Sequence, residues 1–251
     1  MPLRLRACET IAASAIVPPV VAAWALNGAG LANYEVERFS EAVVAFEAAI
    51  RANPGDPHVY NNLANVHRAR GDLGQAAQAY SEALAADPQY GRAYINRGMV
   101  LFVQGDFQQA LTDLDKSVQL QPHASSPLTV RGNIKLAMGD TGGAVVDQTA
   151  AIALNPEYPL PYSNRGCASL IGGNIGAARA DFLQALSLSE AAFNADPQSK
   201  ISKPLATATM LEEMRAMLHL TDPATTRWPR RFDIGRRRLQ EVICGEVPGG
   251  L

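Results

Sequence analysis

Prolines recur at a fixed interval through the middle of the chain, and this periodicity constrains the fold more than any other feature. They close the segments RANP, AADP, QLQP and ALNP, and each lies 34 positions after the one before: Pro54, Pro88, Pro122 and Pro156. A fixed period of about 20 to 50 residues indicates repeated structural units, each packing on its neighbours. Counting back from the prolines, the units begin at Ala23, Pro57, Gly91, Ser125 and Pro159.

Side-chain size repeats within each unit. The eighth residue is small: Gly30, Ala64, Gly98, Gly132 and Gly166. The twentieth is always alanine: Ala42, Ala76, Ala110, Ala144 and Ala178. The twenty-fourth is large in four units (Phe46, Tyr80, Leu114 and Phe182) and is Gln148 in the fourth. We therefore expect two amphipathic helices per unit, which approach closely at the small residues while the large residue fills the space between them.

A glycine followed by a polar residue marks the middle of most units: Gly71-Asp72, Gly105-Asp106, Gly139-Asp140 and Gly173-Asn174. Glycine adopts the left-handed conformation that ends a helix, and Asp or Asn accepts a hydrogen bond from the first turn of the next helix. The proline at position thirty-two then stops the second helix. The unit is thus predicted to be a helix–turn–helix.

This pattern resembles the tetratricopeptide repeat family over residues 23–190, in five copies. The resemblance implies an all-α fold, a right-handed α-solenoid of five helix–turn–helix repeats. In the fifth copy Glu190 replaces the proline, and the next proline is Pro197, so we expect the last second helix to run on. The repeats are predicted at residues 23–56, 57–90, 91–124, 125–158 and 159–197.

The segments outside the repeats have separate interpretations. Residues 198–220 place Leu211, Met214 and Leu218 at helical spacing, which predicts a capping helix over the end of the solenoid. A methionine-rich helix can alternatively be an adaptable binding surface. Residues 1–22 have a basic start and an apolar stretch, typical of either a targeting peptide or a short packing helix.

The composition sets limits on location and chemistry. The apolar stretch near the N-terminus is shorter than the roughly 20 residues that span a bilayer. Three scattered cysteines, Cys8, Cys167 and Cys244, form neither a disulfide framework nor a metal-ligand spacing. We expect an intracellular protein, or a plastid or exported one if the N-terminal segment is a targeting peptide.

Charged residues recur at two positions of the last three repeats. The seventh residue is Arg97, Arg131 or Arg165 and the twenty-third is Asp113, Asp147 or Asp181, whereas the first two repeats carry uncharged residues at both positions. Because the charges occur together, we expect ion pairs between the two helices of one repeat. Their expected role is structural, with little net stabilisation once desolvation is counted; a ligand-binding role for the arginines is the alternative.

In tetratricopeptide repeat proteins, the second, fifth, sixth and ninth residues of each first helix point into a concave groove, so the resemblance implies candidate partner-binding residues. We select polar and flexible members of these positions: His58, Asn61, Asn62, Asn65, Arg92, Asn96, Met99, Asn133 and Asn164. The same positions hold Ile95, Ser126, Thr129, Val130, Leu160, Ser163 and Cys167.

Asparagine recurs at the sixth position of the repeats. A carboxamide offers both a donor and an acceptor, which complements a peptide backbone unit. The row resembles the asparagine ladder of family members that bind extended peptides, such as the repeat domain of O-linked N-acetylglucosamine transferase. The alternative is that the asparagines pair with the backbone of a neighbouring helix. One turn further along, apolar residues either accept partner side chains or pack between helices: Phe102, Val103, Leu136, Leu170 and Ile171.

The sequence argues against one class of partner, the acidic C-terminal tails of chaperones. Family members that hold the acidic tails of chaperones use a clamp of Lys, Arg and Asn. Asn61, Ser126 and Val130 stand where that clamp needs cations, and only Asn65 and Asn96 match it. Without cations there is little to neutralise two carboxylates.

The C-terminal residues 221–251 are rich in arginine, interleaved with Trp228 and Phe232: Arg227, Arg230, Arg231, Arg236, Arg237 and Arg238. Such a tail can bind phosphates, an anionic membrane or an acidic protein. It can also dock on residues 23–190, where 16 acidic against 11 basic side chains give a charge of −5.

No catalytic constellation, cofactor motif or metal spacing is found in the sequence. We therefore expect a non-catalytic scaffold, with no cofactor, that binds an extended peptide or a partner helix in its groove. Family analogy adds a role as an assembly factor for a multi-subunit complex. The alternatives are an RNA-binding repeat protein that uses the arginine tail, and a peripheral membrane adapter. A small-molecule ligand is not expected.

Overall fold

The computed structural model describes residue 10 and residues 17–195, and over this range all regular secondary structure is α-helical. The helices alternate as the first and second helices of successive repeats. The first helices are α2 (Pro19–Glu35), α4 (Pro57–Arg70), α6 (Gly91–Gln104), α8 (Ser125–Ala137) and α10 (Pro159–Ile171). The second helices are α3 (Phe39–Ala52), α5 (Leu73–Ala86), α7 (Phe107–Leu120), α9 (Thr141–Leu154) and α11 (Ile175–Ala195).

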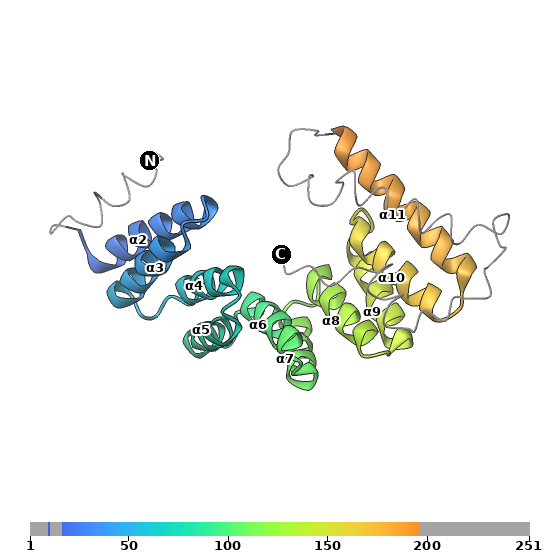
Figure 1. The fold of residues 1–251 in the computed structure, drawn as a ribbon, viewed down its shortest axis with the longest axis horizontal. Helices are drawn as coiled ribbons and strands as arrows, with labels where there is room; N and C mark the ends of the chain where they lie inside the picture. The colour runs from blue at the N-terminus through green and yellow to red at the C-terminus, as the bar shows by residue number, and fades with distance from the viewer. Residues whose placement is uncertain (1–9, 11–16, 196–251) are drawn as a thin grey trace. The chain divides into compact units, whose positions relative to one another are not determined.

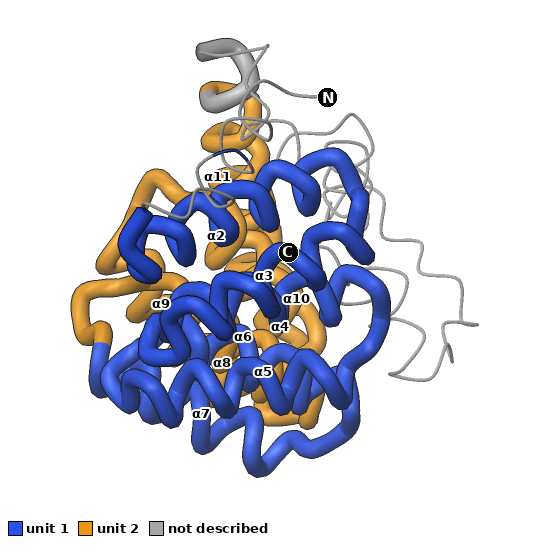
Figure 2. Tube along the Cα trace, turned by 90° about the vertical axis from the view of Figure 1, so that its left-hand side faces the viewer, with its two compact units in different colours: residues 1–120, 250 blue, residues 121–249, 251 orange. Residues whose placement is uncertain are grey.

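The helices (Figure 1) form two compact units that divide after Leu120 (Figure 2). Unit 1 contains α2 to α7 and unit 2 contains α8 to α11. Within unit 1, α4 and α6 lie along one side and α5 and α7 along the other (Figure 1). The predicted all-α repeat fold is confirmed.

In four of the five repeats the core contains the large residue at position twenty-four. Phe46, Tyr80, Leu114 and Phe182 are all 0% exposed, and burying such a side chain stabilises the fold by about 1.5–3 kcal/mol. The small residue at position eight makes room for it: a Cβ added to Gly166 would lie 2.6 Å from Cε1 of Phe182. The size pattern of the sequence is therefore the packing pattern of the repeat.

The turns between paired helices use the left-handed conformation. The φ angles of Gly71, Gly105, Gly139 and Gly173 lie between 82° and 89°, which an L-residue adopts only at a cost of about 1–2 kcal/mol. In the first repeat this position is Glu37, with φ of 59°. The conformation predicted for the four glycines is confirmed, and the first repeat reaches it without glycine.

Capping of the second helices follows the sequence only in part. Asp140 Oδ1 accepts a hydrogen bond of 2.8 Å from the backbone N–H of Gly143, and Asn174 Oδ1 accepts one of 3.1 Å from Ala177. Asp72 makes no such bond. Its carboxylate lies 3.1 Å from Nε of Arg70 instead. The expected cap is therefore wrong for Asp72, because a cation at the end of the preceding helix holds the carboxylate.

Helix α11 continues past Glu190 to Ala195, in keeping with the missing proline at that position. The other segments lie outside the described residues. These are the N-terminal segment up to residue 16 apart from residue 10, the proposed capping helix 198–220 and the arginine tail 221–251.

Candidate partner-binding face

The recurring arginines and aspartates form ion pairs within repeats, as the sequence predicts. In the third repeat, Arg97 Nε and Nη2 donate to the two carboxylate oxygens of Asp113 at 2.8 and 2.7 Å. Arg131 with Asp147 and Arg165 with Asp181 repeat this two-pronged geometry. The aspartates are only 2% to 7% exposed, so each ion pair satisfies a carboxylate that would otherwise be buried without a counter-charge.

Two of these arginines also contact the preceding repeat. Arg97 Nη1 donates to Ser81 Oγ at 3.0 Å, and Arg165 Nη1 donates to Thr149 Oγ1 at 3.1 Å. The hydrogen bond to Asp113 raises the pKa of Arg97, because it stabilises the charged form. These arginines therefore join helices and neighbouring repeats, which supports the structural role.

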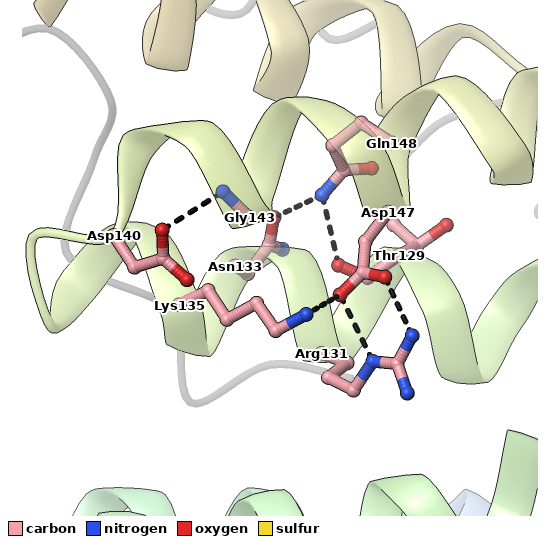
Figure 3. Close-up of polar contacts among 8 residues, drawn as sticks. All are labelled: Thr129, Arg131, Asn133, Lys135, Asp140, Gly143, Asp147 and Gln148. Atoms are coloured by element: carbon pink, nitrogen blue, oxygen red, sulfur yellow. Dashed lines mark hydrogen bonds and ion pairs between the residues drawn. The ribbon is translucent and has the colours of Figure 1, made fainter.

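The fourth repeat carries a second cation and a polar core. Lys135 Nζ lies 2.8 Å from Asp147 Oδ2, in addition to Arg131 (Figure 3). Gln148, 1% exposed, donates from Nε2 to the backbone oxygen of Thr129 at 3.0 Å and to Oδ1 of Asn133 at 2.9 Å. Its own carbonyl oxygen is buried without a hydrogen-bond partner among the described residues.

We use "first-helix face" for positions two, five, six and nine of α2, α4 and α6 in unit 1. Asparagines of successive helices are hydrogen-bonded side chain to side chain on this face. Asn62 Nδ2 donates to Asn27 Oδ1 at 2.9 Å, and Asn96 Nδ2 donates to Asn61 Oδ1 at 2.9 Å. A ladder of carboxamides thus runs from α2 to α6, and its partners are side chains rather than the helix backbone.

The asparagines at position nine have buried partners on the second helix of their own repeat. Tyr80, 0% exposed, donates from its hydroxyl to Asn65 Oδ1 at 2.6 Å, just as Gln148 donates to Asn133. In the other three repeats the residue at position twenty-four carries no donor, and position nine is Leu31, Met99 or Cys167. The buried donor holds the amide oxygen inward, so the amide nitrogen is left for another partner.

The remaining candidates on the first-helix face differ in exposure. His58 and Arg92, both at position two, are exposed. His58 Nδ1 lies 3.1 Å from the Tyr90 hydroxyl, and the two rings meet edge to face. Burial raises the pKa of Tyr90, and the nearby charge of Arg92 opposes that shift. Met99 is half-buried.

Position five is buried in the second, third and fourth repeats, and so in both units: Asn61, Ile95 and Thr129 are 3%, 8% and 3% exposed, so the predicted groove residue Asn61 is not open to a partner. In unit 2, Thr129 donates to the backbone oxygen of Ser125 and Cys167 at position nine is also buried. Asn164 Nδ2 is buried without a hydrogen-bond partner in the described part of the chain. Asn133 is half-buried and held by Gln148.

Of the apolar residues one turn further along the first helices, some pack between helices and others are exposed. Leu136 is buried and Leu170 packs against the same cluster. The Phe102 ring lies 5.5 Å from that of Phe107 across the turn. Val103 and Ile171 are 57% and 36% exposed, so only these two are open to a partner.

Three residues of the first repeat were missed by the sequence reasoning, which applied the family's positions only from the second repeat on. Asn27 at position five is the partner of Asn62. Trp24 at position two and Leu31 at position nine are 65% and 40% exposed. The same register, counted from Ala23, would have found all three.

The described residues contain no group of His, Cys, Asp and Glu side chains suited to a metal ion. No helix in the described range is both long and apolar enough to cross a membrane.

The tetratricopeptide repeat family model matches residues 27–91 and 61–125. Over residues 27–125 the chain therefore consists of tetratricopeptide repeats. A comparison with curated protein sequences found no match. Proteins of this family generally mediate protein–protein interactions as non-catalytic scaffolds.

Solved structures of the same fold include three other repeat proteins. MamA from Desulfovibrio magneticus RS-1 is 16% identical, with a TM-score of 0.59 over 76% of this chain and 98% of that one. TTC0263, a thermophilic repeat protein from Thermus thermophilus, is 22% identical, with a TM-score of 0.58 over 75% and 99%. YrrB, described as having an unusual peptide-binding site, is 17% identical, with a TM-score of 0.54 over 80% and 96%.

Proposed function

We propose that the first-helix face of unit 1 binds an extended peptide segment of a partner protein. The observation that carries this proposal is the carboxamide ladder. Each hydrogen bond between two asparagines uses one group of each side chain and leaves the other without a partner in the described chain. Asn27 keeps an amide N–H₂, whereas Asn62 and Asn96 keep a carbonyl oxygen. Asn65, whose oxygen is held by Tyr80, also keeps its N–H₂.

The unused groups suit a peptide backbone, which offers one donor and one acceptor per residue. Their orientation is fixed before binding by the hydrogen bonds within the ladder. A partner therefore avoids part of the entropy cost of ordering flexible side chains. Recognition through the backbone also gives affinity without strict sequence preference.

The family resemblance extends the proposal to a class of function. A scaffold that holds an extended segment of another protein is suited to assembling a multi-subunit complex, and we propose this role by analogy with the family. The arginine tail, on which the RNA and membrane alternatives depend, lies outside the described residues.

Site-specific photo-crosslinking tests the proposal without breaking the ladder. A photoreactive amino acid is placed at His58 or Met99 on the first-helix face, and at Gln78 or Thr112 on α5 and α7 as matched controls. Gln78 and Thr112 are exposed. After irradiation in extract of the native cells, cross-linked proteins are identified by mass spectrometry.

We expect a common partner to be cross-linked from positions 58 and 99 and not from positions 78 and 112. Cross-linking of that partner only from α5 and α7 would place its contact on the second helices and refute the proposal. Nucleic acid cross-linked from the first-helix face would point to the RNA alternative.

A further inference from the structure

We infer that the peptide bound by the first-helix face carries a bulky apolar side chain for Trp24 and Leu31 at one end and a carboxylate for Arg92 at the other. The inference rests on the proposed function and adds the chemistry of the partner. It depends on exposed groups that the fold itself leaves unused.

The apolar end lies on α2. Val20, Trp24 and Leu31 follow one another at helical spacing and are 46%, 65% and 40% exposed. Residues four and seven apart share a helix face. Asn27 lies on this face between Trp24 and Leu31, and its hydrogen bond to Asn62 shows that the face borders α4. The exposed indole is therefore continuous with the carboxamide ladder.

The charged end lies on α6. Arg92 is exposed and makes no ion pair or hydrogen bond within the described residues. It is also the sole full charge among the twelve positions of the first-helix face, where His58 is the other titratable side chain. Asp56 and Asp87 stand in the loops before α4 and α6, outside these positions, and each accepts a backbone hydrogen bond. A face with one unpaired guanidinium and no carboxylate complements an acidic group.

The distance between the apolar and charged ends of the face gives the expected length of the bound peptide. From α2 to α6 there are two steps between first helices, each bridged by an asparagine pair and each taken as about the 8–10 Å between the axes of neighbouring helices. The two ends are then roughly 16–20 Å apart, a distance that an extended chain covers in about five or six residues. The expected ligand therefore has its apolar and acidic groups about five residues apart, with backbone between them for Asn27, Asn62 and Asn96.

Selection from a library of random peptides about ten residues long tests this directly, using the full chain. The expected result is an enriched apolar residue and an acidic residue, or a free C-terminal carboxylate, at that spacing. Trp24→Ala should remove the apolar preference, and Arg92→Glu should replace the acidic preference by a basic one. Val44→Ala on α3 and Arg51→Ala, both at exposed positions, are the matched controls and should leave the selection unchanged.

The affinities of one selected peptide for the natural protein and for the variants measure how much each anchor contributes to binding. Losing either anchor should weaken binding about tenfold or more. In a Trp228→Phe background, the fluorescence of Trp24 should shift to the blue as the peptide covers it.

Three outcomes would overturn the inference in different ways. Enriched peptides that need Asn27 and Asn62 but show no apolar–acidic pattern would refute the inference and leave the proposed function standing. An indole that acrylamide cannot quench before peptide is added would mean that another part of this chain already occupies the apolar end. If the library yields no binder to the first-helix face, both proposals fail.

Discussion

At the scale of single residues, Asp113, Asp147 and Asp181 are buried and depend on cations from the partner helix. What differs between repeats is the number of cations. Within the described residues Asp181 pairs with Arg165 alone, whereas Asp147 pairs with both Arg131 and Lys135. The cost of losing an arginine should follow that difference, since an unpaired buried charge dominates the penalty.

Arg165→Ala should therefore destabilise the protein more than Arg131→Ala, although both arginines belong to unit 2. We expect losses of about 2–3 kcal/mol and about 1–2 kcal/mol in the free energy of unfolding. Urea denaturation of the two variants measures the difference. Equal losses, or a larger loss for Arg131→Ala, would show that Lys135 does not compensate.

His67 provides a pH dependence at the same scale. Burial lowers its pKa below the usual 6.5, opposed mainly by the nearby charge of Asp72; Arg70 lowers it further and Glu47 raises it. Below about pH 6.5 the unfolded chain takes up a proton that the folded chain resists, so stability should fall as the pH falls through this window. Urea midpoints at several pH values should show this loss, and His67→Gln should reduce it. In His58→Gln, which alters an exposed ring, the loss should persist.

At the scale of elements, each helix pair depends on a turn residue at positive φ and on the buried residue at position twenty-four. Four turns use glycine at positive φ, but Glu37 adopts the same conformation in the first repeat. Glu37→Gly should stabilise the protein by about 0.5–1 kcal/mol, because the relief of left-handed strain exceeds the added entropy of the unfolded chain. A rise in the thermal midpoint checks this. A lower midpoint would mean that the Glu37 side chain stabilises the fold by other contacts.

In the fourth repeat the buried position twenty-four is the polar Gln148, which suggests a stabilising replacement. In the third repeat the matching pair is Leu114 with Met99, both uncharged and without strong hydrogen-bonding groups. Gln148→Leu combined with Asn133→Met should be as stable as the natural protein or up to about 1 kcal/mol more stable, since no donor or acceptor is left unpaired. Gln148→Leu alone should gain less. A double-mutant cycle by urea denaturation separates the two effects.

Periodicity predicts the elements well, because the turn glycine, the stop proline and the packing sizes each follow from local rules. It also predicts the Arg–Asp pairs, since the two charges appear in the same repeats. The hydrogen bond between Asn62 and Asn27 could not be predicted from one repeat, because it depends on how neighbouring helices are stacked. The failure of Asp72 as a cap has a local origin instead, since Arg70, two residues earlier, competes for its carboxylate.

At the scale of the whole molecule, the two units present different first-helix surfaces. Unit 1 combines the carboxamide ladder with exposed Trp24, His58 and Arg92. In unit 2 position two is Ser126 or Leu160, so it carries neither an aromatic ring nor a charge. This contrast favours unit 1 as the binding element, and it predicts that substitutions on α8 and α10 affect stability more than partner affinity.

The central claim is that paired asparagines on the first-helix face leave their remaining amide groups for a peptide backbone. Side-chain amide NMR of the ¹⁵N-labelled full chain tests it most directly, with signals assigned through Asn27→Ser and Asn65→Ser. On addition of a peptide that binds, the N–H₂ signals of Asn27 and Asn65 should shift, while that of exposed Gln78 on α5 stays in place. Binding with unchanged Asn27 and Asn65 signals and a shifted Gln78 signal would contradict the account.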